Sequence, residues 1–190
     1  MKGARGQGNL LCMNFCKWAA QPRGQRLLAF LTLGVIYVSP VTAQTAAEIR
    51  ETIRKRFPAV RQLSTKELAD WLADTNKPAP LLIDARTEKE FAVSRLQNAR
   101  HLESVAQVKS AATSNAQPIV VYCSVGYRSS ALAEKLQQAG FTHVVNLEGS
   151  IFAWANEGRP VYRGTNAVHE VHPYNSKWGQ LLDPPLHPKP

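Results

Sequence analysis

The sequence predicts an α/β domain whose parallel sheet is covered by helices on both faces. Short apolar runs typical of strands, such as 81–83 and 119–122, alternate along the chain with short helix-like stretches, which is the pattern of parallel sheets. The apolar fraction of 44% and the length of 190 residues suit one globular domain with additional segments. Ligands bind beyond the carboxyl ends of such strands, so the residues after each apolar run are the first candidates for chemistry.

The first half of the chain opens with a polar, partly helical stretch over residues 44–62. Residues 64–67 (Ser-Thr-Lys-Glu) match a capping box and predict a helix with Leu68, Trp71 and Leu72 on one face. The elements expected next are a Pro-containing break, a buried strand, a short helix, a second strand and a weak helix, at 76–80, 81–83, 87–91, 99–102 and 105–112.

The second half contains the clearest strand, the apolar run 119–122 that follows Pro118. After a short loop, a helix is expected from Ser129 to the residue before Gly140. A further strand and a short helix with aromatic residues are expected at 144–145 and 149–158. The pattern ends at 162, and the tail holds five of the 12 prolines and three of the five histidines.

Cys123 stands where the clearest strand ends, and it is the most informative residue of the chain. The loop 124–128 (Ser-Val-Gly-Tyr-Arg) separates it from the expected helix. The backbone N–H groups of a tight loop, the positive end of a helix and a cation such as Arg128 all stabilise a thiolate. Thiols in such settings have pKa values of about 3.5–7.5. We therefore expect a reactive nucleophile, the alternative being a buried structural cysteine.

The loop and the start of the expected helix supply further candidate residues, of which Arg128 and Tyr127 have two possible roles each. Gly126 lets the backbone curl without a Cβ clash. Arg128 is expected to bind an anion and favour the thiolate, although it could instead pack at the helix end or form a surface ion pair. Ser129 and Ser130 suit helix capping. Tyr127 either lines the mouth of the site or covers it.

Residues 1–43 have the features of a secretory signal peptide. Basic residues precede a twelve-residue apolar run, Leu27–Val38, and a small-residue site follows at 41–43. A transmembrane helix needs about 20 apolar residues, so a retained membrane anchor is the less favoured alternative. Cleavage before Gln44 predicts an exported protein, in the periplasm or a comparable extracytoplasmic space, without stable membrane insertion.

Removal of this segment changes both the charge and the cysteine count. The whole chain carries +9, but residues 1–43 hold five of its 23 basic residues and no acidic one. The remainder has 18 basic and 14 acidic residues, a formal charge of +4, so nucleic-acid binding is not predicted. Cys12 and Cys16 are lost as well, which leaves Cys123 as the only thiol, without a disulfide partner.

Three motifs in this order resemble the single-domain rhodanese-like sulfurtransferases. They are LLIDARTEKEF, VVYCSVGYRSS and AGFTHVVNLEGSIFAW, at 81–91, 120–130 and 139–154. The resemblance implies a three-layer fold with a central, mostly parallel five-stranded sheet flanked by helices. It covers residues 63–161, which leaves 44–62 as an N-terminal lead-in and 162–190 as a tail containing proline and histidine.

Two segments depart from the pattern of that family. The family often has Gly-His-Ile-Pro-Gly-Ala where residues 94–99 read Ser-Arg-Leu-Gln-Asn-Ala, and Ser150 stands where a second glycine is usual. We expect both changes to lie away from the nucleophile and to alter loop shape and partner contacts.

The resemblance also implies a reaction, the transfer of sulfane sulfur through a persulfide on Cys123. The donor would be a small anion such as thiosulfate, and the acceptor cyanide, a thiol or a protein; no cofactor is implied. Asp84 would support the site, while for Arg86 a structural ion pair is an equal alternative to substrate binding. The expected substrate-binding residues are Ser124, Val125, Gly126, Tyr127, Arg128, Ser129 and Arg86.

The length of the loop argues against a phosphatase. Phosphatases that resemble this fold have five residues between cysteine and arginine, whereas four separate Cys123 from Arg128. The tighter loop suits a single sulfur atom better than a tetrahedral oxyanion. The remaining rival hypothesis is a non-enzymatic module of the same fold that binds a partner or carries or senses sulfur.

The tail carries two further signals. His169 and His172 are three residues apart without other ligand types nearby, which is a weak metal signal, and no metal site is predicted. Tyr174 and Trp178 indicate that the tail packs back on the domain, and if it folds over the loop it would restrict the acceptor.

Overall fold

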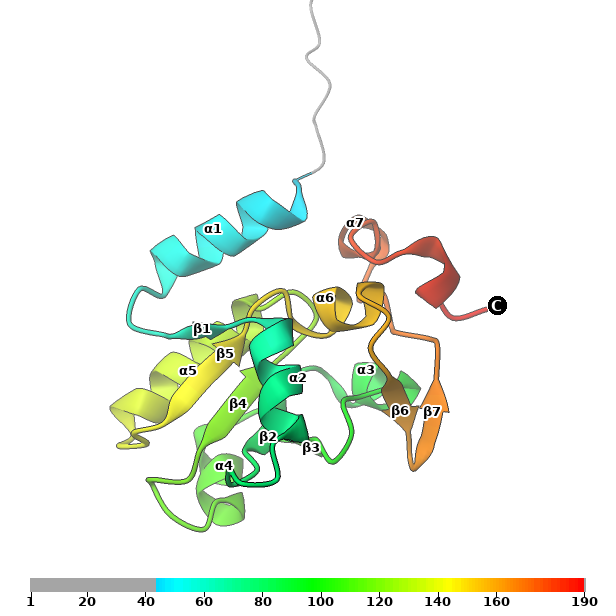
Figure 1. Ribbon diagram of the computed structural model, residues 1–190. Coiled ribbons are helices and arrows are strands. Elements are labelled where there is room, and N and C mark those ends of the chain that lie inside the picture. Colours follow the sequence, from blue (N-terminus) through cyan, green and yellow to red (C-terminus); the bar gives the residue numbers. More distant parts are fainter. Residues whose placement is uncertain (1–43, 190) are drawn as a thin grey trace, which may run out of the picture. The chain divides into compact units, whose positions relative to one another are not determined.

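A computed structural model describes residues 44–189, so the expected signal peptide lies outside the described residues. Its centre is a parallel five-stranded sheet with the strand order β1-β5-β4-β2-β3, which confirms the predicted fold class (Figure 1). The strands are β1 (Gln62–Leu63), β2 (Leu81–Asp84), β3 (Arg100–His101), β4 (Ile119–Tyr122) and β5 (Val144–Leu147).

Seven α-helices and a small hairpin accompany this sheet in the described part of the chain. The hairpin pairs β6 (Val161–Arg163) with β7 (Asn166–Val168), and a 3₁₀ turn covers Pro184–Leu186. Four of the helices begin with a reciprocal capping box, those after Thr45, Ser64, Thr87 and Ser104. The helices are α1 (Ala46–Arg56), α2 (Thr65–Ala73), α3 (Glu88–Val93), α4 (Val105–Ala111), α5 (Tyr127–Gln138), α6 (Ser150–Asn156) and α7 (Ser176–Gly179).

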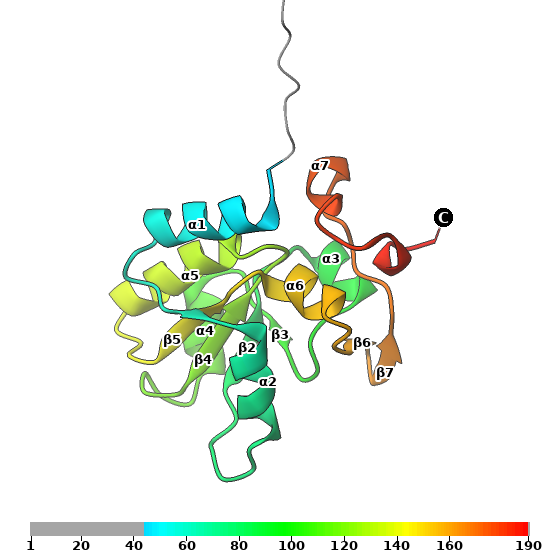
Figure 2. The ribbon, with the colours of Figure 1, turned by 45° about the horizontal axis from the view of Figure 1, so that its top comes forward.

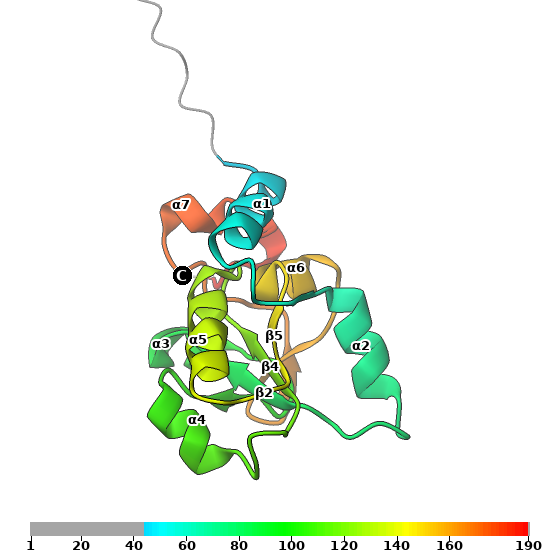
Figure 3. The ribbon, with the colours of Figure 1, turned by 90° about the vertical axis from the view of Figure 1, so that its left-hand side faces the viewer.

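The pleat of β4 divides the core into two layers. Ile119 and Val121 pack with apolar residues of α1, α4 and α5 on one face, and Val120 and Tyr122 pack with α2, α6 and the tail on the other. Figure 3 shows α4 and α5 on one side of the sheet and α2 on the opposite side. Both faces are therefore covered, as the continuous apolar character of the strand predicts.

Several predicted details are wrong or incomplete. The edge strand β1 was not predicted, because two residues are too few to show an alternation of apolar and polar side chains. The β6–β7 hairpin was not predicted either, because it lies at the point where the alternation of strand-like and helix-like segments ends. Leu72 is 42% exposed and does not share the buried face with Leu68. The fifth helix begins at Tyr127, two residues before the expected Ser129, because Gly126 takes the cap position.

The tail is part of the folded core, which confirms the expectation that it packs back. Val171 and Leu182 are buried in the cluster formed by α2 and α6, and Trp178 packs against both core clusters. Near the N-terminal end of the described residues, Ile49 and Ile53 of α1 are also buried. Among residues 44–189, no helix combines the length and apolar character that crossing a membrane requires.

Candidate active site

Cys123 follows the last residue of β4, at the carboxyl edge of the sheet, and three residues separate it from α5. The turn closes at Gly126, whose φ of 111° lies in the left-handed region. A Cβ there would approach the Asn146 amide and Ile53 to 3.3 Å. The loop therefore packs closely against neighbouring side chains. Glycine fits this position because it adopts the left-handed dihedral without strain and has no Cβ to clash.

The sulfur of Cys123 receives two donors from the start of α5. The Gly126 N–H lies 3.2 Å from Sγ, and the Ser129 hydroxyl lies 3.4 Å from it. Burial raises the pKa of this thiol, but the Ser129 hydroxyl, the charge of Arg128 and the N–H groups of Ser129 and Gly126 outweigh it, so the pKa lies below its ordinary value. The geometry therefore favours a thiolate.

Arg128 is bound by a carboxylate that the sequence reasoning did not identify. Its guanidinium donates to both carboxylate oxygens of Glu90, at 2.7 and 2.8 Å, and to the Ser124 hydroxyl at 2.9 Å. Glu90 is buried, and burial raises its pKa, but the hydrogen bonds from Arg128, Thr87 and Ser124 lower it to about 2. The Thr-x-x-Glu pattern at 87–90 marks Glu90 as a helix-capping residue, but it does not reveal the pairing with Arg128.

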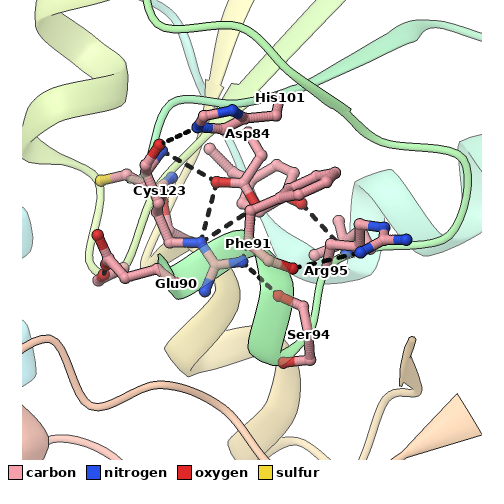
Figure 4. Close-up of polar contacts among 12 residues, drawn as sticks. Asp84, Glu90, Phe91, Ser94, Arg95, His101 and Cys123 are labelled. Atoms are coloured by element: carbon pink, nitrogen blue, oxygen red, sulfur yellow. Dashed lines mark hydrogen bonds and ion pairs between the residues drawn. The ribbon is translucent and has the colours of Figure 1, made fainter. Parts of the chain in front are cut away.

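Asp84 and Arg86 form a fully buried ion pair, and Arg86 does not reach the cavity described below. The guanidinium donates to Asp84 at 2.7–3.1 Å and to the Ser94 carbonyl, and both side chains are 0% exposed. In Figure 4 the sulfur of Cys123 points away from Asp84 and His101. This geometry favours the structural ion pair over substrate binding for Arg86, because its guanidinium is buried and lines no part of the cavity.

Ser150 lies against Cys123, contrary to the expectation that this departure from the family pattern is remote from that residue. Its hydroxyl accepts a hydrogen bond from the Cys123 N–H at 3.1 Å and donates to the Leu147 carbonyl at 3.1 Å. Its φ of 53° lies in the left-handed region, which glycine adopts with less strain than serine. A serine therefore adds a side-chain contact to the Cys123 backbone at the cost of a less favourable dihedral.

A cavity of about 340 Å³ opens above Cys123. Its walls come from α1, from the 123–128 loop and from the tail. Figures 1 and 2 draw α1 and α7 at the same end of the domain. Tyr127 lines this cavity while 47% exposed and packs edge-on against Phe57. Tyr174 of the tail lines it too, with its ring 4.8 Å from the Arg128 guanidinium carbon. The tail therefore lies over the loop.

The tail histidines are not brought together with other ligand types. No group of three or more His, Cys, Asp or Glu side chains that could hold a metal occurs among residues 44–189. The Nδ1 of His172 instead accepts a hydrogen bond from the Tyr174 N–H at 3.0 Å. This contact helps to shape the tail next to the cavity.

The fold and site together define a class: a parallel α/β domain with a buried cysteine in a tight loop between a strand and a helix. Residues 64–157 match the family model described as "Rhodanese-like domain". A relative named "Sulfurtransferase", from Allochromatium vinosum, is 33% identical over 103 residues, which are 54% of this chain and 94% of the relative. The chain belongs to the rhodanese-like family.

Two further proteins agree with this placement. The "Thiosulfate sulfurtransferase GlpE" of Vibrio cholerae is 32% identical over 82 residues, 42% of this chain and 76% of the relative. A solved structure titled "Thiosulfate sulfurtransferase" from Pseudomonas aeruginosa covers 72% of this chain and 26% of its own, with a TM-score of 0.54 and 18% identity. The latter supports the fold alone. The family and its named relatives support sulfur transfer as the general chemistry.

Proposed function

We propose that the protein is a sulfurtransferase that moves sulfane sulfur from a donor such as thiosulfate to a thiophilic acceptor through a persulfide on Cys123. The thiolate attacks the outer sulfur of thiosulfate, the S–S bond breaks, and its electron pair leaves with sulfite. An acceptor nucleophile such as cyanide or a thiol then attacks the outer sulfur of the persulfide. The second S–S bond breaks and returns the thiolate, which makes the scheme ping-pong.

The observation that carries this proposal is the pair of donors on the sulfur of Cys123. The Gly126 N–H and the Ser129 hydroxyl are fixed by the first turn of α5, so they need no reorganisation when charge develops on sulfur. The same positions can stabilise the thiolate that leaves in the second half-reaction. The names of the relatives point to the same chemistry.

The test is intact mass spectrometry of the protein before and after thiosulfate, followed by a cyanide chase. We expect a gain of one sulfur atom, loss of that sulfur on the chase, and thiocyanate in the supernatant. Cys123→Ala and Cys123→Ser should take up no sulfur and form no thiocyanate. Wild-type turnover in either variant would refute the proposal.

A non-enzymatic module that carries or senses sulfur is the second candidate. Cys123 is only 1% exposed and the tail lies over its loop, which would slow discharge of a persulfide to any acceptor. In that case sulfur would load in the mass experiment and then resist both cyanide and thiols. Rapid removal of the persulfide sulfur by cyanide or thiols would favour the enzyme over the non-enzymatic module.

Export is part of the proposal and has its own test. The basic segment, the apolar run and the small-residue site within residues 1–43 support cleavage before Gln44. We expect the N-terminus of the protein purified from an extracytoplasmic fraction to begin at Gln44. Retention of the full-length chain in the cytoplasmic fraction would contradict export.

A further inference from the structure

We propose that the physiological sulfur-exchange partner of Cys123 is a thiol with an apolar body, such as an alkyl or aryl group, which binds in the cavity above the cysteine. This inference rests on the proposed function, since it requires a persulfide on Cys123. It goes further by naming the chemical class of substrate that the cavity selects.

The walls of the cavity are predominantly apolar and aromatic. The polar residues that line it are Gln44, Thr52, Ser124 and Arg128, besides Cys123 itself. The apolar and aromatic residues that line it are Ile49, Ile53, Val125, Tyr127, Tyr174 and Trp178. Its volume of about 340 Å³ falls in the range of small-molecule sites, about 300–1,000 Å³. Cyanide or one sulfur atom would leave most of this space unfilled, whereas a thiol with a ring or a branched chain would fill it.

The distribution of charges around the cavity also favours a ligand with an apolar body. Among the described residues that line it, Arg128 is the only charged one. Both of its terminal nitrogens donate to Glu90, and the Tyr174 ring lies against its guanidinium. A charged acceptor would lose its hydration in the cavity and find no unpaired cation or anion among these described residues to compensate. An apolar group would instead bind favourably, because its transfer out of water lowers the free energy.

The chemistry of the exchange is balanced without a further reactant. The thiolate of the partner attacks the outer sulfur of the Cys123 persulfide. The S–S bond of the persulfide breaks and its electron pair returns to the Cys123 thiolate, which Gly126 and Ser129 stabilise. The product is the persulfide of the partner, whose outer sulfur takes the proton that the partner thiol loses when it becomes the thiolate. The reverse reaction would load Cys123 from the same class of persulfide.

The test measures how fast three small thiols remove the persulfide sulfur from protein loaded with thiosulfate. They are benzyl mercaptan, 2-mercaptoethanol and the anion 2-mercaptoethanesulfonate. Each rate is divided by the rate of the same thiol with a small-molecule persulfide, so that intrinsic thiol reactivity cancels. We expect benzyl mercaptan to exceed the sulfonate by about tenfold or more, the usual scale of discrimination in an apolar pocket.

A charge placed in the cavity wall should reverse this preference. Thr52 of α1 lines the cavity, is exposed and donates its hydroxyl to the carbonyl four residues earlier. Thr52→Lys should lower the benzyl mercaptan rate about fivefold and raise the sulfonate rate. The matched control is Ser110→Lys, because Ser110 is an exposed α4 residue with the same kind of backbone bond and does not line the cavity.

Removal of an aromatic wall gives a second, independent variant. Tyr174 is 45% exposed, so Tyr174→Ala should fold, and it should reduce the benzyl mercaptan rate by about tenfold with little effect on 2-mercaptoethanol. Leu72→Ala, at an exposed apolar residue outside the cavity, should change neither rate.

The outcomes separate this inference from the proposed function. If Cys123 takes up no sulfur from thiosulfate or from an organic persulfide, the proposed function and the inference both fail. If the persulfide forms and the three thiols discharge it at equal corrected rates, sulfur transfer stands and the inference alone is overturned. A sulfonate preference in the wild-type protein would also overturn it.

Discussion

At the scale of single residues, the lowered pKa of Cys123 depends on a hydroxyl that the loop itself does not provide. Ser129 belongs to the first turn of α5, and its hydroxyl is the largest favourable contribution to the lowered pKa of the thiol. The neighbouring Ser130 is equally buried, but its hydroxyl has no hydrogen-bond partner among residues 44–189. The two serines therefore offer a matched pair of substitutions.

We expect Ser129→Ala to raise the pKa of Cys123 and Ser130→Ala to leave it unchanged. The rate of alkylation by iodoacetamide, followed by mass spectrometry between pH 5 and 10, reports the thiolate fraction. Below the thiol pKa the Ser129 variant should react about tenfold more slowly than wild type, because a hydrogen bond to a charged group contributes roughly 1.5 kcal/mol. Equal profiles for both variants would contradict the assigned role.

Two opposing contributions of similar size to the free energy of unfolding come from Ser150. Its positive φ costs about 1 kcal/mol relative to glycine, but its hydroxyl satisfies the buried N–H of Cys123, and an unsatisfied donor costs about 1–3 kcal/mol. Denaturant unfolding should give the stability order wild type, Ser150→Gly, Ser150→Ala, since alanine loses the hydrogen bond and keeps the dihedral cost. A glycine variant more stable than wild type would mean that the dihedral dominates.

At the scale of elements, Glu90 joins the N-terminus of α3 to that of α5. It closes the capping box with Thr87 and also binds Arg128 and Ser124. Glutamine at this position can still close a capping box, so Glu90→Gln removes the ion pair and keeps the cap. Glu67→Gln is the control, because Glu67 closes the exposed capping box of α2.

We expect Glu90→Gln to lower the free energy of unfolding by about 2 kcal/mol, and Glu67→Gln to change it little. The pKa of Glu90, about 2 in the folded protein, lies below its ordinary value of 4.5. The carboxylate therefore stabilises the fold fully above about pH 4.5, and this contribution is lost as the pH falls toward 2. Denaturant titrations from pH 7 to 2.5 should show a shallower acid decline for the glutamine variant.

The central elements could be predicted from the sequence because local patterns specify them. The apolar run 119–122 and the Gly-containing loop after it suffice to place β4, Cys123 and the start of a helix to within two residues. Glu90 and Ser150 could not be assigned to the site in this way. Their contacts with 124 and 123 cross 34 and 27 residues of chain, and only the fold brings those strand ends and helix starts together.

At the scale of the whole molecule, segments outside the matched family region complete the core and the cavity. The family match covers 64–157, whereas the buried Ile53 of α1 and the buried Leu182 of the tail lie outside it. Tyr174 and Trp178 predicted that the tail packs back on the domain, but the burial of Leu182 could not be predicted, because the tail is short, rich in proline and without periodicity. Its burial depends on the apolar surface that α2 and α6 present to it.

If the tail stabilises the fold, a single core substitution in it should destabilise the whole domain. Leu182 is 2% exposed, and Leu182→Ala should lower the free energy of unfolding by about 2–4 kcal/mol. Leu72→Ala makes the same chemical change at a residue that is 42% exposed, and should cost no more than about 0.5 kcal/mol. Denaturant unfolding, followed by far-ultraviolet circular dichroism and by tryptophan fluorescence, provides the comparison.

The two optical probes also test whether the tail and the sheet unfold together. Trp178 lies in the tail and packs against both core clusters, while Trp154 lies in α6. In one cooperative unit, fluorescence and circular dichroism give the same midpoint, and Leu182→Ala moves both equally. A fluorescence transition that precedes the loss of secondary structure, or equal stability of the two leucine variants, would instead mean that the tail docks on an independently stable domain. It would then act on the cavity above Cys123 without supporting the core.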